Sequence, residues 1–169
     1  MGAAFDGHCA AQLRALFDPS QFQNPAAVTL TMKKRVGGHN TDAIVASENF
    51  RHFMSRLNHN ILGSAAKLHG RRLKTVAVIE SNADARLHYH AMIDRPHYCS
   101  FEAFKEAVTA QWLRTDFGYR QIDIQDAADA GWTDYILKLR QKISLLDSIG
   151  WNRQSEIRRK NKRRSRGPS

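Results

Sequence analysis

Apolar residues recur along this chain with two different periods, and each period predicts one kind of element. Four segments alternate apolar with polar residues or carry runs of β-branched and aromatic residues, the pattern of a strand. They cover residues 26–32, 73–81, 86–93 and 119–125. Only Asn82-Ala83-Asp84-Ala85, a turn sequence, separates the second from the third, so we expect these two strands to form a β-hairpin.

In other segments the apolar residues recur every three or four positions, as on one face of a helix. We expect Ser47 and Ser100 each to cap such a helix. Their apolar stripes are Phe50, Phe53, Met54, Leu57 and Ile61, and then Phe101, Phe104, Val108 and Trp112. Further helices are expected over 8–17 and over about 131–146, and a loop over 37–40. Interspersed helices around an antiparallel pair predict an α+β two-layer sandwich.

Two histidines and a glutamate are expected to meet on one face of the hairpin. His88 and His90 lie two residues apart on a strand, so both side chains leave the same face. If Asp84 is at the centre of the hairpin, Glu80 faces His88 across the ladder, at a Cβ separation of about 5 Å. Two imidazoles and a carboxylate suit Mn²⁺ or Mg²⁺, with positions left open for substrate. A histidine pair alone would indicate only a surface feature, and the carboxylate is what favours a metal site.

The opposite face of the hairpin is expected to be apolar and to pack under helices. It would carry Ala77, Ile79, Leu87, Tyr89, Ala91 and Ile93, whereas Val76, Val78 and Met92 share the face of the charged trio. The charged side chains are thus separated from the predicted core.

The last predicted helix has a buried stripe and, beside it, a stripe with candidate chemistry. The buried stripe is Trp132, Ile136, Leu139, Ile143 and Leu146, and Tyr135, Lys138 and Lys142 form the adjacent stripe. A phenol ionises near pH 10, so it needs help to act as a nucleophile at neutrality. A neighbouring ammonium favours the phenolate, and it can stabilise the charge that builds on a phosphate under attack. By itself, Tyr135 would be an ordinary residue at a helix edge.

Charge and composition point to a polyanionic partner. The chain has 169 residues and a net charge of +10, with eight basic residues and one acid from Arg153 onward. We expect one domain over 1–150 and a basic, disordered tail over 151–169. Cys9 and Cys99 give no disulfide framework or CxxC metal site, and no apolar run is long enough for a membrane span or secretion signal. A reducing compartment is therefore expected, either the cytoplasm of a bacterial, plasmid or phage host or the nucleus of a eukaryotic one.

Several basic and polar residues are expected to contact nucleic acid. The candidates are Arg35, His39 and Asn40 in one loop, Arg71 and Arg72 in another, Lys142 on the last helix, and Arg158 and Arg159 in the tail. Partners at a membrane are not expected.

Together, these motifs resemble the HUH endonucleases, named for two histidines around a bulky hydrophobic residue, here His88-Tyr89-His90. The likeness is greatest to single-tyrosine replication initiators of small circular single-stranded DNA replicons. Those initiators carry an acidic ligand eight positions before the first histidine, as Glu80 is, and a tyrosine with a lysine three residues on, as in Tyr135 and Lys138. Their first motif is an apolar and threonine strand, similar to Val28-Thr29-Leu30-Thr31.

The resemblance implies a ferredoxin-like or RRM-like antiparallel sheet that carries the histidine hairpin, with helices on the other face. It implies that Glu80, His88 and His90 bind Mn²⁺ or Mg²⁺, that Tyr135 is the nucleophile and that Lys138 assists it. The expected function is nicking and strand transfer of single-stranded DNA at an origin or hairpin through a 5′-phosphotyrosine, which initiates rolling-circle replication. The alternatives are an HUH transposase or plasmid-mobilisation relaxase, and a non-catalytic binder of single-stranded nucleic acid. The helicase domain of many such initiators is not found in this sequence, and the oligomeric state stays open, a monomer included.

Overall fold

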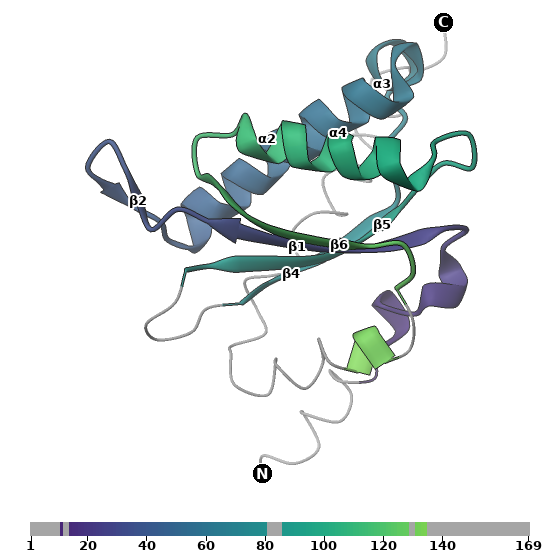
Figure 1. Ribbon diagram of the computed structural model, residues 1–169, viewed down its shortest axis with the longest axis horizontal. Helices are drawn as coiled ribbons and strands as arrows, with labels where there is room; N and C mark the ends of the chain where they lie inside the picture. The colour runs from purple at the N-terminus through teal and green to yellow at the C-terminus, as the bar shows by residue number, and fades with distance from the viewer. Residues whose placement is uncertain (1–10, 12–13, 81–85, 129–130, 135–169) are drawn as a thin grey trace, which may run out of the picture.

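The molecule is built around one antiparallel sheet of four strands. The computed structural model describes residues 11, 14–80, 86–128 and 131–134 (Figure 1). The strands are β1 (Pro25–Met32), β4 (Thr75–Glu80), β5 (His88–Asp94) and β6 (Gly118–Gln125), in the order β4-β5-β1-β6. A short hairpin of β2 (Arg35–Val36) and β3 (His39–Asn40) extends from the end of β1. The central position of β1 makes it a neighbour of both the histidine strand and the last strand.

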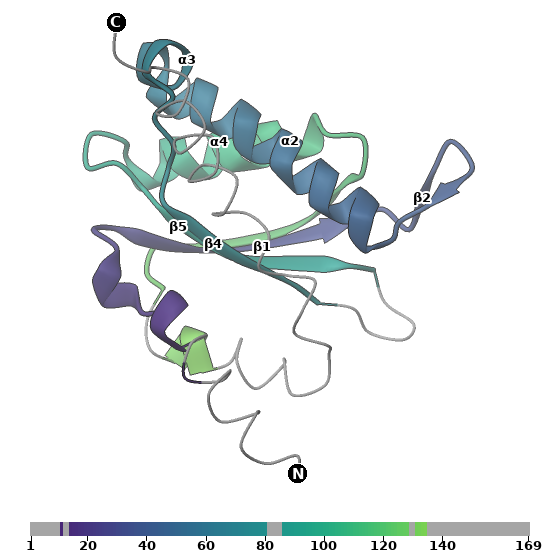
Figure 2. The same cartoon turned by 180° about the vertical axis from the view of Figure 1, so that it is seen from behind.

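Two long helices cover one face of this sheet. They are α2 (Ala43–Leu62) and α4 (Phe101–Leu113), and the short α3 (Ser64–His69) follows α2 directly (Figures 1 and 2). A single turn of 3-10 helix, η1 (Pro19–Gln21), precedes β1 on the other side. The predicted α+β two-layer sandwich, with an antiparallel sheet and helices on one face, is confirmed.

The main core lies between the sheet and the helices α2 and α4. Phe50 of α2 stacks on Tyr89 of β5 with ring centroids 4.4 Å apart, and Phe53 meets Trp112 of α4 edge-on at 5.4 Å. The other members of the core that the sequence had placed on this face are Ala77, Ile79, Leu87, Ala91 and Ile93. Aromatic pairs of this kind combine a large buried area with a preferred geometry. They fix the helices on the sheet, and the opposite face is left for other residues.

A second, smaller cluster covers part of the opposite face. Phe17, Phe22 and Ala128 pack there with Val78 and Met92 of the sheet. The chain on both sides of the sheet supplies this layer: Phe17 and Phe22 precede β1, and Ala128 and Trp132 follow β6 (Figure 1). The face that carries the histidines is therefore partly apolar, as the sequence predicted for Val78 and Met92.

Four local predictions need correction. Asp42, not Ser47, caps α2, because its carboxylate accepts the N–H of Val45 at 2.8 Å and the helix begins at Ala43. Residues 37–40 are not all loop, since His39 and Asn40 pair back with the β2 strand around the two glycines. The strand expected from residue 73 begins at Thr75 instead, because the N–H of Leu73 bonds to a side chain. The helix α3 was not predicted; it is only six residues long and carries little periodic signal.

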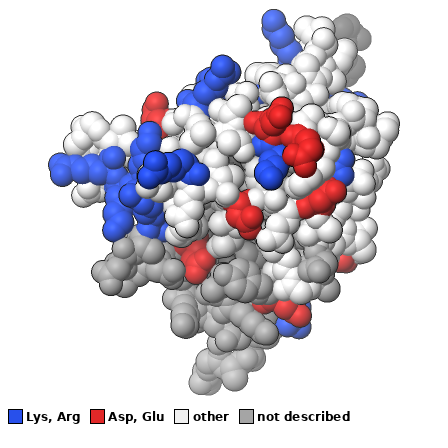
Figure 3. Space-filling model, viewed as in Figure 1, with Lys and Arg blue, Asp and Glu red and all other residues white. Residues whose placement is uncertain are grey.

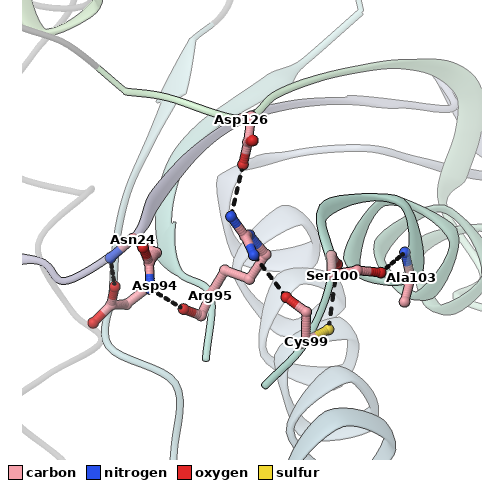
Figure 4. Close-up of polar contacts among 7 residues, drawn as sticks. All are labelled: Asn24, Asp94, Arg95, Cys99, Ser100, Ala103 and Asp126. Atoms are coloured by element: carbon pink, nitrogen blue, oxygen red, sulfur yellow. Dashed lines mark hydrogen bonds and ion pairs between the residues drawn. The ribbon is translucent and has the colours of Figure 1, made fainter. Parts of the chain in front are cut away.

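The ends of three strands are tied together by a network around Asp94 and Arg95 (Figure 4). Asp94 accepts the backbone N–H groups of Gln23 and Asn24, at 3.0 and 2.8 Å, just before β1 begins. Arg95 donates to the carbonyl of Cys99 at 2.6 Å and to Asp126 at 2.9 Å, directly after β6 ends. These contacts join the start of β1, the end of β5 and the end of β6. They fix the point from which the chain leaves β6 toward its last segment.

Some predicted elements lie wholly or partly outside the described residues. Residues 14–16 are helical, as expected for the end of the first helix, and residues 131–134 are helical, as expected for the start of the last one. The rest of both helices and the 151–169 tail lie outside the described part of the chain, so the predicted domain limits stay a prediction.

We predict that Asn58→Ala destabilises the fold by about 1–3 kcal/mol. Asn58 is 3% exposed; its Oδ1 accepts the N–H of Leu73 at 2.7 Å, and its Nδ2 donates to the carbonyl of Met54 at 2.6 Å. Alanine would leave the Leu73 N–H buried without this acceptor. Urea unfolding measures the change, and Asn60→Ala, at an exposed position of the same helix, is the matched control. Equal unfolding midpoints for the two variants would contradict the prediction.

Candidate active site

The pairing of β4 with β5 brings Glu80 and the two histidines to one face of the sheet. Glu80 is opposite His88, and Val78 is opposite His90, which is the register expected from a hairpin centred on Asp84. Side chains alternate along a strand, so Glu80, His88 and His90 share a face. The trio lies at the end of the sheet where β4 ends and β5 begins. The prediction that these three residues share one patch is therefore confirmed, whereas metal binding at the patch stays a prediction.

Two threonines of β1 hold the histidine rings from the neighbouring strand. Thr31 pairs with His88 and Thr29 with His90 in the β1–β5 ladder. The hydroxyl of Thr31 lies 3.0 Å from His88 Nδ1, and that of Thr29 lies 3.2 Å from His90 Nδ1. Each ring thus has its Nδ1 engaged by β1, so Nε2 is the nitrogen available to other partners. Such outer hydrogen bonds fix ring orientation in metal-binding histidines.

Glu80 contacts the second histidine, not the one opposite to it. Its Oε2 lies 2.8 Å from His90 Nε2, and His90 is 7% exposed. An ionised carboxylate accepts a hydrogen bond here, so His90 Nε2 carries the proton. Among the described residues, no group of three His, Cys, Asp or Glu side chains is already arranged to hold a metal ion. An ion at this patch would require the Glu80 carboxylate to give up its direct contact with His90.

The other histidine is electrostatically suited to remain neutral. Burial lowers the pKa of His88 below its ordinary value, and the nearby His90 lowers it further, whereas the Glu80 carboxylate acts in the opposite direction. A lowered pKa means that His88 is a neutral imidazole at neutral pH. A neutral imidazole can donate a lone pair to a cation, which a protonated one cannot.

The residue between the histidines has a structural role on the other face. Tyr89 stacks on Phe50 in the main core and is 4% exposed. Burial raises the pKa of its phenol far above the usual value, so Tyr89 stays protonated. It faces away from the histidines and is not a candidate nucleophile. Its bulk instead anchors the histidine strand to α2.

The last described segment begins on the histidine face. Trp132 packs against Phe17 with ring centroids 6.2 Å apart, and the hydroxyl of Thr133 donates to the carbonyl of Phe17 at 2.9 Å. The N–H of Ala128 donates to the carbonyl of Pro25 at 2.9 Å, so this segment is fixed to the start of β1. Trp132 also borders the cluster that contains Val78 and Met92, which share a face with Glu80 and the histidines. The predicted nucleophile helix therefore starts on the layer that also carries the candidate site.

Several predicted site residues lie outside the described part of the chain. They are Tyr135, Lys138, Lys142, Arg158 and Arg159. Their roles stay predictions from the sequence.

The predicted DNA-contacting residues that are described occupy two different ends of the molecule. Arg35, His39 and Asn40 lie on the β2–β3 hairpin, which follows the end of β1 where Thr31 meets His88. Arg71 and Arg72 follow α3 and precede β4, whose first residue is at the opposite end of the sheet from Glu80. Figure 1 shows α3 and the hairpin at opposite ends, and Figure 3 shows lysine and arginine gathered at the hairpin end. Only the first group lies at the end of the sheet that carries the site.

Sequence reasoning missed the residues of β6 that flank the site. Thr29 is opposite Asp123 of β6 as well as His90 of β5. Tyr119 of β6 lies under the guanidinium of Arg86, with Cζ 4.0 Å from the ring centroid. Neither the position of Asp123 nor the contact of Tyr119 with Arg86 could be predicted without knowing that β1 lies between β5 and β6. The only signal in the sequence was that β1 and β6 both alternate.

The fold and this face define a class of protein: an α+β domain whose antiparallel sheet carries paired histidines and a carboxylate on the face away from α2 and α4. A family model for the replication-associated protein ORF2/G2P matches residues 25–143, from the start of β1 through the predicted tyrosine helix. The chain therefore belongs to the replication-associated protein ORF2/G2P family. No curated protein and no solved structure was found to match it. Among the described helices, none is both long and apolar enough to cross a bilayer.

We predict that Thr31→Val changes the hydrogen bonding of His88 alone. Valine has nearly the shape of threonine but no hydroxyl, so His88 Nδ1 loses its partner at 3.0 Å while the Thr29–His90 contact is kept. Imidazole ¹⁵N spectra should show a changed tautomer balance for His88 and an unchanged one for His90. Thr29→Val is the reciprocal control and should affect His90. If both rings respond equally to either change, the one-to-one pairing is wrong.

Proposed function

We propose that this replication-associated protein is a metal-dependent nickase that cuts single-stranded DNA through Tyr135 and so initiates rolling-circle replication. The observation that carries the proposal is the shared patch of Glu80, His88 and His90, with both Nδ1 atoms held by β1 threonines. Family membership supports the replication role, because the matched region spans both this patch and Tyr135.

The donor set fits a divalent cation such as Mn²⁺ or Mg²⁺. Two imidazole nitrogens and a carboxylate are ligands that borderline and hard cations accept, and the patch offers them from two paired strands. Holding Nδ1 by hydrogen bonds leaves Nε2 of His88 and His90 as the ligand atoms, with Glu80 as the third ligand. When bound, the ion would polarise the scissile phosphate and favour in-line displacement.

Tyr135 supplies the nucleophile in this proposal. Its phenolate oxygen attacks phosphorus, a bond forms between the tyrosine and the phosphate at the 5′ end of the downstream fragment, and the bond from phosphorus to the 3′ oxygen of the upstream fragment breaks. The leaving oxygen takes a proton and becomes a free 3′ hydroxyl, which can prime synthesis. No water is consumed, so the same bond can be re-formed by the reverse attack. Lys138 and Lys142 would favour the phenolate and the charge on the phosphate.

The start of the last helix supports the placement of this nucleophile. Thr133 is buried against Phe17, and Asp134, which precedes Tyr135 in the sequence, forms an exposed ion pair with Arg14 at 3.7 Å. This segment is packed on the face that carries Glu80 and the histidines. The helix therefore begins on the correct side of the sheet for a residue that acts at the patch.

Among the alternatives, membership in a replication-associated family favours replication over transposition or plasmid mobilisation. The remaining alternative is a non-catalytic binder of single strands. Such binders place aromatic rings on the sheet face for stacking, whereas this face carries histidines and a carboxylate at the corresponding centre.

We predict that Tyr135→Phe abolishes a covalent protein–DNA adduct. Labelled single-stranded DNA from the native origin, incubated with the protein and Mn²⁺, should yield a band that survives denaturing electrophoresis. Phenylalanine keeps the ring but removes the attacking oxygen. Tyr98→Phe, at a tyrosine that is 64% exposed and precedes α4, is the matched control and should leave the adduct intact. An adduct that persists in Tyr135→Phe would contradict the assignment of Tyr135 as the nucleophile. If the wild-type protein forms no adduct with any origin strand, the non-catalytic binder is favoured.

We predict that Glu80→Gln weakens Mn²⁺ binding by about tenfold or more while the fold is kept. The amide has the size of the carboxylate but lacks its charge, so one anionic ligand is lost from the patch. Calorimetric titration with Mn²⁺ measures the affinity, and Glu102→Gln, on the first turn of α4, is the matched control. Equal affinities in the wild type and in Glu80→Gln would exclude Glu80 as a ligand.

A further inference from the structure

We propose that Arg86 and Tyr119 form a stacking site for one nucleotide of single-stranded DNA, directly beside His88. The proposal depends on the proposed function only for the choice of DNA as the ligand. It assigns a binding role to two residues outside the Glu80, His88 and His90 patch.

The guanidinium of Arg86 lies over the ring of Tyr119, across the central strand. The guanidinium carbon of Arg86 lies 4.0 Å from the centroid of the Tyr119 ring. Arg86 precedes β5 and Tyr119 is the second residue of β6, while β1 separates these two strands in the sheet. The contact therefore crosses over the end of β1, where Thr31 pairs with His88.

Alternation along the strand places this contact on the histidine face. The carbonyl of Leu87 accepts the N–H of Met32 at 2.9 Å, which continues the β1–β5 ladder past His88. Leu87 packs into the main core on the helix side. Its neighbour Arg86 therefore projects to the opposite side, as His88 does, so the stacked pair and the candidate metal ligands share one surface.

An irregularity in β6 brings Tyr119 to this position. Leu30 pairs with Ile122, but Met32 pairs with Gly118, so three residues of β6 lie opposite Thr31 alone. Extra residues of this kind redirect side chains, and they are concentrated next to active sites. The residues in this irregular stretch are Tyr119, Arg120 and Gln121, two more than a regular ladder would place opposite the threonine that holds His88.

The surroundings of the pair are strongly basic. The segments that meet at this end of the sheet are held together by bonds from Lys33, whose N–H donates to Phe117 O at 2.8 Å and whose Nζ donates to Asp116 O at 2.9 Å. Residues 33–35, 86 and 114–120 carry six basic residues, Lys33, Lys34, Arg35, Arg86, Arg114 and Arg120, and one acid, Asp116. Glu80 lies at the same end of the sheet, opposite His88. Figure 3 shows this end as a concentration of positive side chains, with the acidic ones gathered mainly over α4. The charge attracts a phosphate backbone to this end.

The chemistry of the pair fits a nucleobase with its phosphate. The N–H groups of a guanidinium lie in its own plane, where they can bind phosphate, and its planar face can stack on a base. Only an unpaired strand exposes the faces of its bases in this way, so duplex DNA is not the ligand. A base held here lies beside His88, which sets the register of the strand relative to the Glu80, His88 and His90 patch.

The experiment measures binding alone, with the full chain, a fluorescein-labelled oligothymidine and EDTA to remove divalent ions. Fluorescence anisotropy gives the dissociation constant at several salt concentrations. We expect Tyr119→Ala and Arg86→Ala to weaken binding by roughly tenfold, a typical loss for one stacked base. Tyr119→Phe keeps the ring and should bind within about twofold of the wild type.

Arg86→Lys distinguishes stacking from charge. Lysine keeps the positive charge but has no planar group, so affinity should fall nearly as far as in Arg86→Ala, while the salt dependence stays that of the wild type. Arg51→Lys, at an exposed position of α2 on the other side of the sheet, should change neither quantity. These conservative variants keep the test decisive if Tyr119→Ala does not fold.

Wild-type affinity in Arg86→Lys, or in a folded Tyr119→Ala, would overturn the proposal, as would a loss in Tyr119→Phe equal to that in Tyr119→Ala. Tighter binding of oligouridine or of duplex DNA than of oligothymidine would overturn single-stranded DNA as the ligand. Because no metal or cleavage is involved, a missing covalent adduct would contradict the nickase without affecting this result. Normal cleavage together with normal binding in Arg86→Lys would contradict the stacking site alone.

Discussion

The hydrogen bonding of β1 to β5 is the constraint on which the rest of the site depends. This pairing places Thr29 and Thr31 beside the two histidines, and their hydroxyls engage both Nδ1 atoms. A shift of one residue would turn every side chain of β1 to the other face and bring apolar residues against the imidazoles. The register cannot slip, because Val28 and Leu30, which alternate with the threonines, are fully buried under the helices. The core therefore fixes the site by fixing the register.

Much of the sheet could be predicted from the sequence, and so could the central feature of the site. The hairpin register depends only on the distance from Glu80 to His88 and on alternation, both local properties. The order of the strands is not local. Nothing in the alternation of residues 26–32 or 119–125 says that β1 lies between β5 and β6, so the threonine contacts and the Arg86–Tyr119 pair could not be placed.

The errors in local structure have related causes. Ser47 and Asp42 are both good capping residues, and the actual cap was decided by where the short β2–β3 hairpin ends, which is a tertiary feature. Leu73 has the composition of a strand residue, but Asn58 of α2 takes its N–H and delays the start of β4. At Leu73 a side chain competed with the regular backbone pattern, and propensity alone does not decide such a competition.

Thr31 connects the core, the candidate site and the irregular part of β6 through different groups of one residue. Its hydroxyl contacts His88, and its carbonyl accepts the indole N–H of Trp112 at 3.1 Å, at the point where the β1–β6 register shifts. Trp112 is completely buried between α4 and the sheet and meets Phe53 edge-on, so this bond ties the break in the ladder to the main core. An irregular strand end would otherwise be free to move the residues beside it. Trp112 anchors Thr31 from the helix side of the sheet. Thr31 in turn holds the imidazole of His88 and lies opposite the irregular residues of β6, so both are positioned by the same anchored residue. The helix layer thus contributes to the site through the bond from the Trp112 indole to the carbonyl of Thr31.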